Sequence, residues 1–319
     1  MSRTYHIQGT EEFGYSTINR YLCSLYTYEN IVKQVCASSN NCAAVQFMEG
    51  YAAHFCYIRL QSFKTFLRVV VEIKDHVTAL CILRMLGDCV AIFHLIYLES
   101  DENLRWLRHC LYVIDGCEQS LKVLPEDIDW QKDCMPDDEF ELFKREVESN
   151  RQDRLRKIRE AEEILEKSPF KDEEAFKQIV EERNWKFDEF KTHSKKGKNQ
   201  YSWERMYERI GCTENVNNFS FYSQYAHGLS ISNLITKADQ ASIDRVLADA
   251  VGLLDRMCHY MLSFFKDYNF RIYASFLDPE TRDRILACFD DEHRKSILDW
   301  SIHIYRILDS IVAEQRQKI

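Results

Sequence analysis

The feature that most restricts the fold of this chain is its shortage of turn-forming residues. Its 319 residues include only 9 glycines and 4 prolines. A β-rich fold needs frequent turns, and turns depend strongly on these two residue types. Apolar residues instead recur at steps of three and four, as they do between Ile243 and Phe265, which aligns them along one helical face. The sequence therefore predicts an all-α protein built as a multi-helix bundle.

The helix boundaries are predicted from this spacing and from the four prolines, which lie where helical patterns start or stop. Asp101 and Asp278 are predicted N-caps. The segment 67–73 (LRVVVEI) has the β-branched character of a strand, but it lies inside a longer helical pattern without turn residues and is predicted to be helical. The predicted helices span 18–36, 41–74, 76–99, 101–123, 137–167, 171–184, 202–210, 217–228, 239–268, 279–288 and 290–315.

The composition changes in the middle of the chain and suggests three parts. Residues 137–184 are dense in charge, and 151–167 read RQDRLRKIREAEEILEK, in which opposite charges lie three and four positions apart, as on a solvated helix. We therefore expect residues 1–136 and 201–319 to form one core bundle. Residues 137–200 are predicted to form a charged helical excursion that ends in a basic loop.

Charge and cysteine usage indicate the environment. The net charge of −9 disfavours non-specific coating of DNA or RNA. The 12 cysteines are scattered through apolar helical patterns, where a thiol behaves as a small buried hydrophobe, so all are expected to be reduced. The chain opens without the apolar segment of a signal peptide. Its longest strongly apolar run, 89–98, is about half of the roughly 20 residues that a membrane span needs. These observations predict a cytoplasmic protein outside the membrane.

Common catalytic and cofactor motifs are missing from the sequence. It contains no C-x-x-C or H-E-x-x-H pattern of a zinc site, no glycine-rich phosphate loop and no G-x-S-x-G elbow. It also lacks the arginine and histidine, separated by four to six intervening residues, that helical toxin ribonucleases carry; Arg105 and His109, at i and i+4, are closer together than that. No metal or cofactor is predicted.

Two polar pairs interrupt apolar helical faces. Arg84 and Asp88 lie four residues apart in ALCILRMLGDCVAIFHLIYL, so their side chains can reach each other on a helix. Ser223 and His227 have the same spacing in FYSQYAHG. A charged pair in such apolar surroundings is expected to be buried and bonded. Either pair can be a structural contact rather than a working site.

The order of these segments resembles an uncharacterised bacterial family of all-helical proteins, some encoded near phage-defence or mobile-element genes. The resemblance covers about residues 40–265 and rests on ILRMLGDCVAIFHLIYL, DENLRWLRHCLYV, YSWERMYERIG and FYSQYAHG. The family usually carries glutamate at the position of Asp88. The resemblance supplies no reaction, but it implies that six residues converge on one pocket: Arg84, Asp88, Arg108, Tyr222, Ser223 and His227.

Three functional hypotheses follow. The first is a binding or regulatory module, in the setting of a phage-defence or toxin–antitoxin system, whose polar pocket recognises a small anionic ligand or a protein partner segment. The second is a metal-independent nuclease that uses His227 with Arg84 or Arg108. In that hypothesis RNA would be attracted by a basic loop containing Lys191, Lys195, Lys196 and Lys198. The third is a structural scaffold with a polar core network. The sequence does not indicate an oligomeric state.

Overall fold

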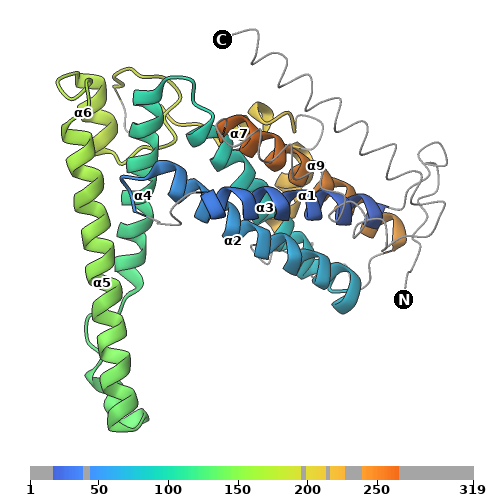
Figure 1. Ribbon diagram of the computed structural model, residues 1–319, viewed down its shortest axis with the longest axis horizontal. Helices are drawn as coiled ribbons and strands as arrows, with labels where there is room; N and C mark the ends of the chain where they lie inside the picture. The colour runs from blue at the N-terminus through green and yellow to red at the C-terminus, as the bar shows by residue number, and fades with distance from the viewer. Residues whose placement is uncertain (1–16, 39–43, 195–198, 213–215, 227–238, 266–319) are drawn as a thin grey trace. The chain divides into compact units, whose positions relative to one another are not determined.

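The computed structural model describes residues 17–38, 44–194, 199–212, 216–226 and 239–265, and within these ranges every regular element is helical (Figure 1). The prediction of an all-α, multi-helix protein is therefore confirmed. The elements are α1 (Thr17–Ser38), α2 (Met48–Arg68), η1 (Val69–Ile73), α3 (His76–Tyr97), α4 (Glu102–Val123), η2 (Asp129–Cys134), α5 (Asp137–Glu166), α6 (Glu174–Glu181), α7 (Trp203–Arg209), α8 (Val216–Ala226) and α9 (Gln240–Phe264). The two helices predicted after residue 278 lie outside the described residues.

The β-branched segment before α3 is helical, as predicted, but it is wound more loosely than the helix that precedes it. Residues Val69–Ile73 form a π-helical turn that continues α2. This turn ends at Lys74, which adopts the left-handed backbone conformation (φ 62°) and so terminates the helix. Asp75 then accepts hydrogen bonds from the Thr78 amide at 3.0 Å and the Thr78 hydroxyl at 2.6 Å, which caps the start of α3. The two helices are therefore separated by a lysine in the left-handed backbone conformation and an aspartate N-cap, without a glycine or a proline.

Side-chain caps also fix the starts of two other helices. Asp101 accepts hydrogen bonds from the amides of Asn103 at 2.8 Å and Leu104 at 3.1 Å, as its predicted role as N-cap of α4 requires. Asp239 accepts from the Ser242 amide at 2.8 Å at the start of α9. Both caps satisfy amide groups that have no partner within the helix itself.

The chain divides into two compact units. The first contains residues Met1–Asn41, Ala52–His94 and Trp203–Ile319, and the second contains Cys42–Tyr51 and Leu95–Ser202. This division differs from the predicted one, which grouped α4 with the N-terminal part of the core bundle. Helix α4 belongs with the charged middle of the chain because it packs along α5.

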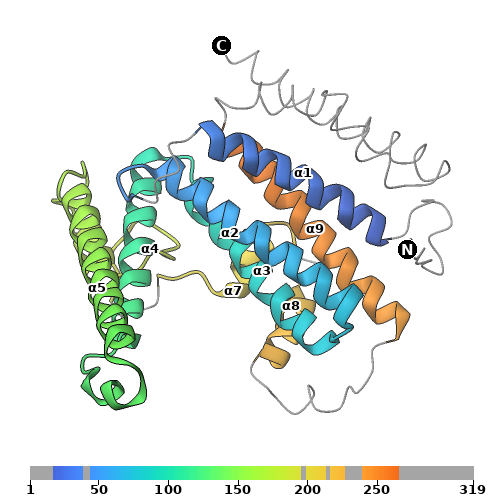
Figure 2. The same ribbon diagram turned by 60° about the horizontal axis from the view of Figure 1, so that its bottom comes forward.

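The first unit is a bundle in which α1 and α9 run side by side, next to α2 and α3 (Figure 2). Its core is rich in aromatic side chains whose polar atoms are bonded to the main chain. The Tyr21 hydroxyl donates to the Phe63 carbonyl at 2.8 Å, and the Tyr28 hydroxyl donates to the Cys56 carbonyl at 2.7 Å. These bonds let α1 bury tyrosines against α2 without leaving an unpaired hydroxyl.

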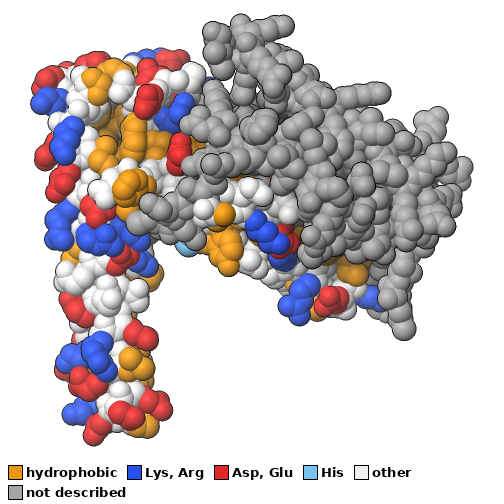
Figure 3. All heavy atoms as spheres, viewed as in Figure 1, with side chains coloured by type: hydrophobic (Ala, Val, Ile, Leu, Met, Phe, Trp, Pro, Cys, Tyr) orange, Lys and Arg blue, Asp and Glu red, His pale blue; other side chains and the backbone are white. Residues whose placement is uncertain are grey.

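The second unit is built on α4 and α5. Only Phe140, Ala161 and Leu165 of the 30-residue α5 are buried, and Lys, Arg, Asp and Glu side chains are interspersed on its visible face (Figure 3). The segment is therefore the solvated, charged helix that the sequence predicted, with a narrow buried stripe.

The apolar stretch of helix α3 is longer than the run identified in the sequence. Among the described helices it alone is long and apolar enough, by length and composition, to cross a membrane, with a mean hydropathy of 1.9 in its most apolar window. Of that window, 56% is buried inside the protein. A core helix of a soluble protein passes the same test, so this property assigns no location.

Candidate functional site

The predicted pair on α3 forms, and α7 completes it. Arg84 Nη1 donates to Asp88 Oδ1, and the Tyr207 hydroxyl from α7 donates to the same oxygen. The Arg84 guanidinium carbon lies 5.0 Å from the ring centroid of Tyr207 and 5.6 Å from that of Trp203. Both rings attract the cation through their π faces. We call these four residues the α3–α7 cluster.

The pair is less buried than the sequence suggested. The side chain of Arg84 is 13% exposed and that of Asp88 is 26% exposed. Burial lowers the pKa of the Arg84 guanidinium, while the charge of Asp88 and its hydrogen bond act in the opposite direction. Arg84 is thus a cation held largely out of water, with one edge still at the surface.

A line of ring contacts connects the α3–α7 cluster to α8. Tyr207 stacks on Phe219 with ring centroids 4.8 Å apart, and Phe219 meets Tyr222 edge-on at 5.8 Å. Gly87 makes this approach possible, because a Cβ atom at that position would lie 2.5 Å from Phe219 Cε1. The absence of a side chain on α3 therefore admits the α8 ring.

Tyr222 in turn reaches a carboxylate on α9. Its hydroxyl donates to Asp249 Oδ2 at 2.5 Å, and the Asn218 amide donates to the same oxygen at 3.4 Å. Burial raises the pKa of Asp249, whereas these two hydrogen bonds act to lower it. Burial also raises the pKa of Tyr222, and the adjacent Asp249 charge adds to this effect. Arg84, Asp88 and Tyr222, three of the six predicted site residues, therefore belong to one continuous set of contacts.

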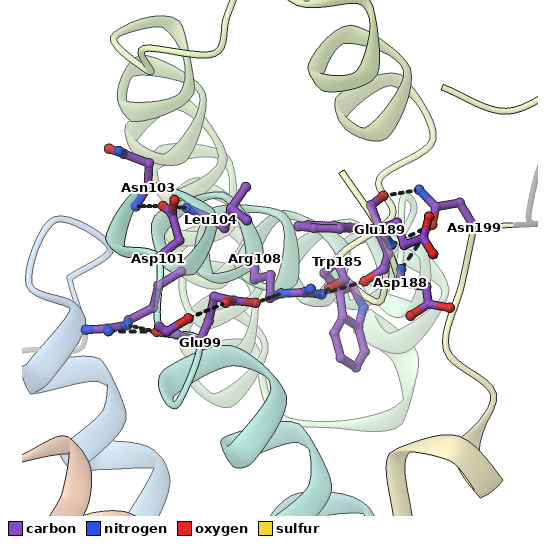
Figure 4. A network of polar contacts seen from close by, with 12 residues as sticks. Glu99, Asp101, Asn103, Leu104, Arg108, Trp185, Asp188, Glu189 and Asn199 are labelled. Carbon is purple, nitrogen blue, oxygen red and sulfur yellow. Dashed lines mark hydrogen bonds and ion pairs between the residues drawn. The ribbon is translucent and has the colours of Figure 1, made fainter. Parts of the chain in front are cut away.

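Arg108 belongs to a different network, within the second unit (Figure 4). Its Nη1 donates to the carbonyls of Trp185 at 3.1 Å and Phe187 at 2.8 Å, and its Nε lies 3.4 Å from Glu99 Oε2. The guanidinium carbon lies 3.8 Å from the Phe187 ring centroid, and the side chain is only 3% exposed. Arg108 thus holds the irregular segment after α6 against α4.

The same segment is held by an asparagine. Asn199 Oδ1 accepts from the amides of Asp188 at 3.2 Å and Glu189 at 2.9 Å (Figure 4). Asn184 donates to the Asn199 carbonyl at 2.7 Å. In this irregular segment, hydrogen bonds from side chains satisfy main-chain groups that a helix would satisfy with its own backbone.

The other residues predicted for the site or for the basic loop are only partly described by the structure. Ser223 is partly buried on α8 beside Tyr222. His227 lies outside the described residues, and so do Lys195, Lys196 and Lys198. Lys191 is exposed and forms an ion pair with Glu189. Among the described residues, no group of three or more His, Cys, Asp or Glu side chains is arranged to hold a metal ion.

Several members of this set of contacts were not predicted from the sequence. Trp203 and Tyr207 lie four positions apart on α7, a spacing that places both rings on one helical face. Asp249 interrupts an apolar stretch of α9, as Asp88 does on α3. Either pattern could have singled these residues out, but neither shows which residues of other helices they meet.

Comparison of the chain with protein-family models, with curated proteins and with solved structures finds no match. The site is therefore interpreted from its own chemistry.

Proposed function

We propose that this protein is a helical binding or regulatory module that recognises an anionic ligand, or an acidic segment of a protein partner, at the α3–α7 cluster. The observation that carries the proposal is the arrangement of Arg84. Two aromatic rings and Asp88 fix its guanidinium, and 13% of the side chain is exposed. A guanidinium held in this way has lost much of its freedom before a ligand arrives.

The donors of Arg84 support this role. Among the described residues, only its Nη1 has a hydrogen-bond acceptor, the Asp88 carboxylate. A guanidinium has five N–H donors in a planar fork that matches carboxylate and phosphate oxygens. An oxyanion at the exposed edge would accept from donors that Asp88 does not use.

A structural scaffold is the second candidate, and one observation favours it. Asp88 accepts hydrogen bonds from both Arg84 and Tyr207, so the cluster fastens α7 to α3 without any ligand. The nuclease hypothesis gains no such support. Arg108, one of its two candidate cations, is buried and donates to main-chain carbonyls, which is a structural arrangement.

An anion titration separates binding from scaffolding. Inorganic phosphate and acetate are added in separate series at constant ionic strength, and the heat of binding and the Tm are measured for the wild type, Arg84→Gln and Arg68→Gln. Arg68 is the matched control because it forms an i,i+4 pair with Glu72 but is 71% exposed. The proposal expects saturable binding of at least one anion to the wild type and Arg68→Gln, and its loss in Arg84→Gln. Equal responses in all three proteins, or no response in the wild type, would overturn it.

A further inference from the structure

A second arginine of the first unit lacks the kind of partner that such a charge normally has. Arg59 lies on α2 and is partly buried against α3. Its Nη1 points at the thioether sulfur of Met85 at 3.2 Å, and its guanidinium carbon lies 5.5 Å from the Phe55 ring centroid. The Cys89 thiol donates to the same sulfur at 3.6 Å. The surroundings of this cation are thus sulfur atoms and an aromatic ring.

These neighbours satisfy the guanidinium poorly. A thioether sulfur is a weak acceptor, and the Nε atom of Arg59 is buried without a hydrogen-bond partner among the described residues. A buried cation is normally paired or fully hydrogen-bonded, because desolvation otherwise costs several kcal/mol. An unsatisfied buried donor on a charged group therefore calls for an explanation, and an absent ion or ligand is one.

Other arginines in the described part of the chain show the usual arrangement. Arg84 is paired with Asp88, and Arg183 binds Glu118 at 3.2 Å and Glu162 at 3.1 Å. Arg256 has no carboxylate partner in the described ranges, but it donates to three main-chain carbonyls at 2.7 to 2.9 Å. Arg59 differs from these arginines because its only described hydrogen bond goes to sulfur.

We infer that Arg59 is an oxyanion-binding position, at which a carboxylate or phosphate group supplies the acceptors that the described residues do not. The Nε–H group and one Nη–H group form the edge of the fork that binds two oxygens side by side. Ser62 lies three residues further along α2, on the same side of the helix, and its hydroxyl makes only a 3.4 Å contact with the Ile58 carbonyl. Its hydroxyl is a further donor on that side of the helix. This inference does not depend on the α3–α7 cluster, because Arg59 lies on α2 and contacts Met85, which is not a member of that cluster.

The test observes the Nε–H group directly. Protein labelled with ¹⁵N-arginine is titrated with inorganic phosphate and, separately, with N-acetylglutamate, and the side-chain Nε–H resonances are followed by NMR. The Arg59 resonance is assigned from its absence in Arg59→Lys. We expect it to move saturably with at least one of the two anions in the wild type and in Arg84→Gln. The phosphate and the glutamate series distinguish a phosphate group from an acidic side chain as the source of the oxyanion.

Stability gives a second, independent measurement. Arg59→Met removes the charge and fills the space beside Met85 and Phe55, so this variant should retain the Tm of the wild type without added anion and lose its rise in Tm on addition of phosphate or N-acetylglutamate. An Arg59 resonance that stays fixed in both titrations would refute the inference. So would a rise in Tm that Arg59→Met retains. Because Arg84→Gln leaves Arg59 intact, failure at one arginine is distinguishable from failure at the other.

Discussion

The Tyr207 hydroxyl donates a hydrogen bond to Asp88, although 119 positions separate the two residues. The bond joins α7 to α3, and Arg84 binds the same carboxylate oxygen. The bond that fastens α7 to α3 and the arginine of the proposed anion site therefore share one acceptor. The contribution of this bond can be measured without disturbing the stacking on Phe219.

Tyr207→Phe removes only the hydroxyl. We expect it to lower the free energy of unfolding by about 1–2 kcal/mol, because a charge-assisted hydrogen bond is lost in a partly buried place. Urea unfolding followed by circular dichroism measures the change. Tyr57→Phe is the control, since Tyr57 is 47% exposed on α2. Equal effects of the two substitutions would show that the Asp88 bond contributes nothing specific.

Two helical glycines give opposite predictions for the same substitution. An alanine at Gly87 would place its Cβ atom 2.5 Å from Phe219, so Gly87→Ala should destabilise the protein by about 1–3 kcal/mol. Gly116 on α4 has no atom within 4 Å of such a Cβ, and Gly116→Ala should stabilise by about 0.5–1 kcal/mol through helix propensity. Thermal unfolding of both variants tests the close approach of α8 to α3. A stabilising Gly87→Ala would contradict it.

Local sequence patterns predicted the local structure of this chain well. The start of α3 at His76, the cap at Asp101 and the Arg84–Asp88 pair each depend on residues within four positions of one another. These features follow from helix geometry and capping, which depend only on residues close together in the sequence.

Tertiary partners were predicted less well, because no local pattern specifies them. A pocket shared by Asp88 and His227 stays a prediction, because His227 lies outside the described residues; Tyr207 is a partner of Asp88 that the sequence did not indicate. For Arg108, the sequence did not indicate its acceptors within the second unit, the carbonyls of Trp185 and Phe187. Every residue has a main-chain carbonyl, so the residue type does not reveal which carbonyl accepts a hydrogen bond from a distant side chain. The grouping of α4 with α5 likewise depends on which helix covers its apolar face.

The role of Arg108 leads to a stability prediction. Arg108→Gln leaves Glu99 without its ion pair and removes the donor that two main-chain carbonyls share. We expect a loss of about 3–5 kcal/mol in the free energy of unfolding, as for other broken buried pairs. Arg145→Gln serves as a control, because Arg145 is exposed and bonds only the Glu141 carbonyl of its own helix. If both variants unfold at the same urea concentration as the wild type, Arg108 does not hold the segment.

The cysteines allow a test of the predicted reduced state. The nine cysteines that the structure describes are free thiols, and burial raises the pKa values of Cys56 and Cys258 well above their usual range. Iodoacetamide should therefore label exposed Cys134 rapidly and these two only on unfolding. Mass spectrometry of freshly isolated protein measures the labelling at each position. A native disulfide anywhere in the chain would contradict the prediction that all 12 cysteines are reduced.

His109 on α4 makes stability depend on pH in a defined direction. It is fully buried, with Nε2 3.2 Å from the Val45 carbonyl, and burial lowers its pKa to about 4, while the contact with the carbonyl acts in the opposite direction. The ring packs edge-on against Tyr51 and Trp106 at 5.1 and 5.8 Å, so no carboxylate is among these contacts to stabilise a charged imidazole.

The sign follows from proton uptake. In the unfolded chain an ordinary histidine has a pKa of about 6.5, so below that pH the unfolded state binds a proton that the folded state excludes. His109 should therefore favour the folded state fully above pH 6.5. This contribution should fall progressively between pH 6.5 and pH 4, by about 3 kcal/mol in total. Urea unfolding at half-unit pH intervals measures the slope for the wild type, His109→Gln and His259→Gln, the last an exposed control on α9. We expect the slope to become shallower in His109→Gln and to persist in His259→Gln. A slope that is the same in all three proteins would mean that His109 takes up its proton in the folded state and is not excluded from water.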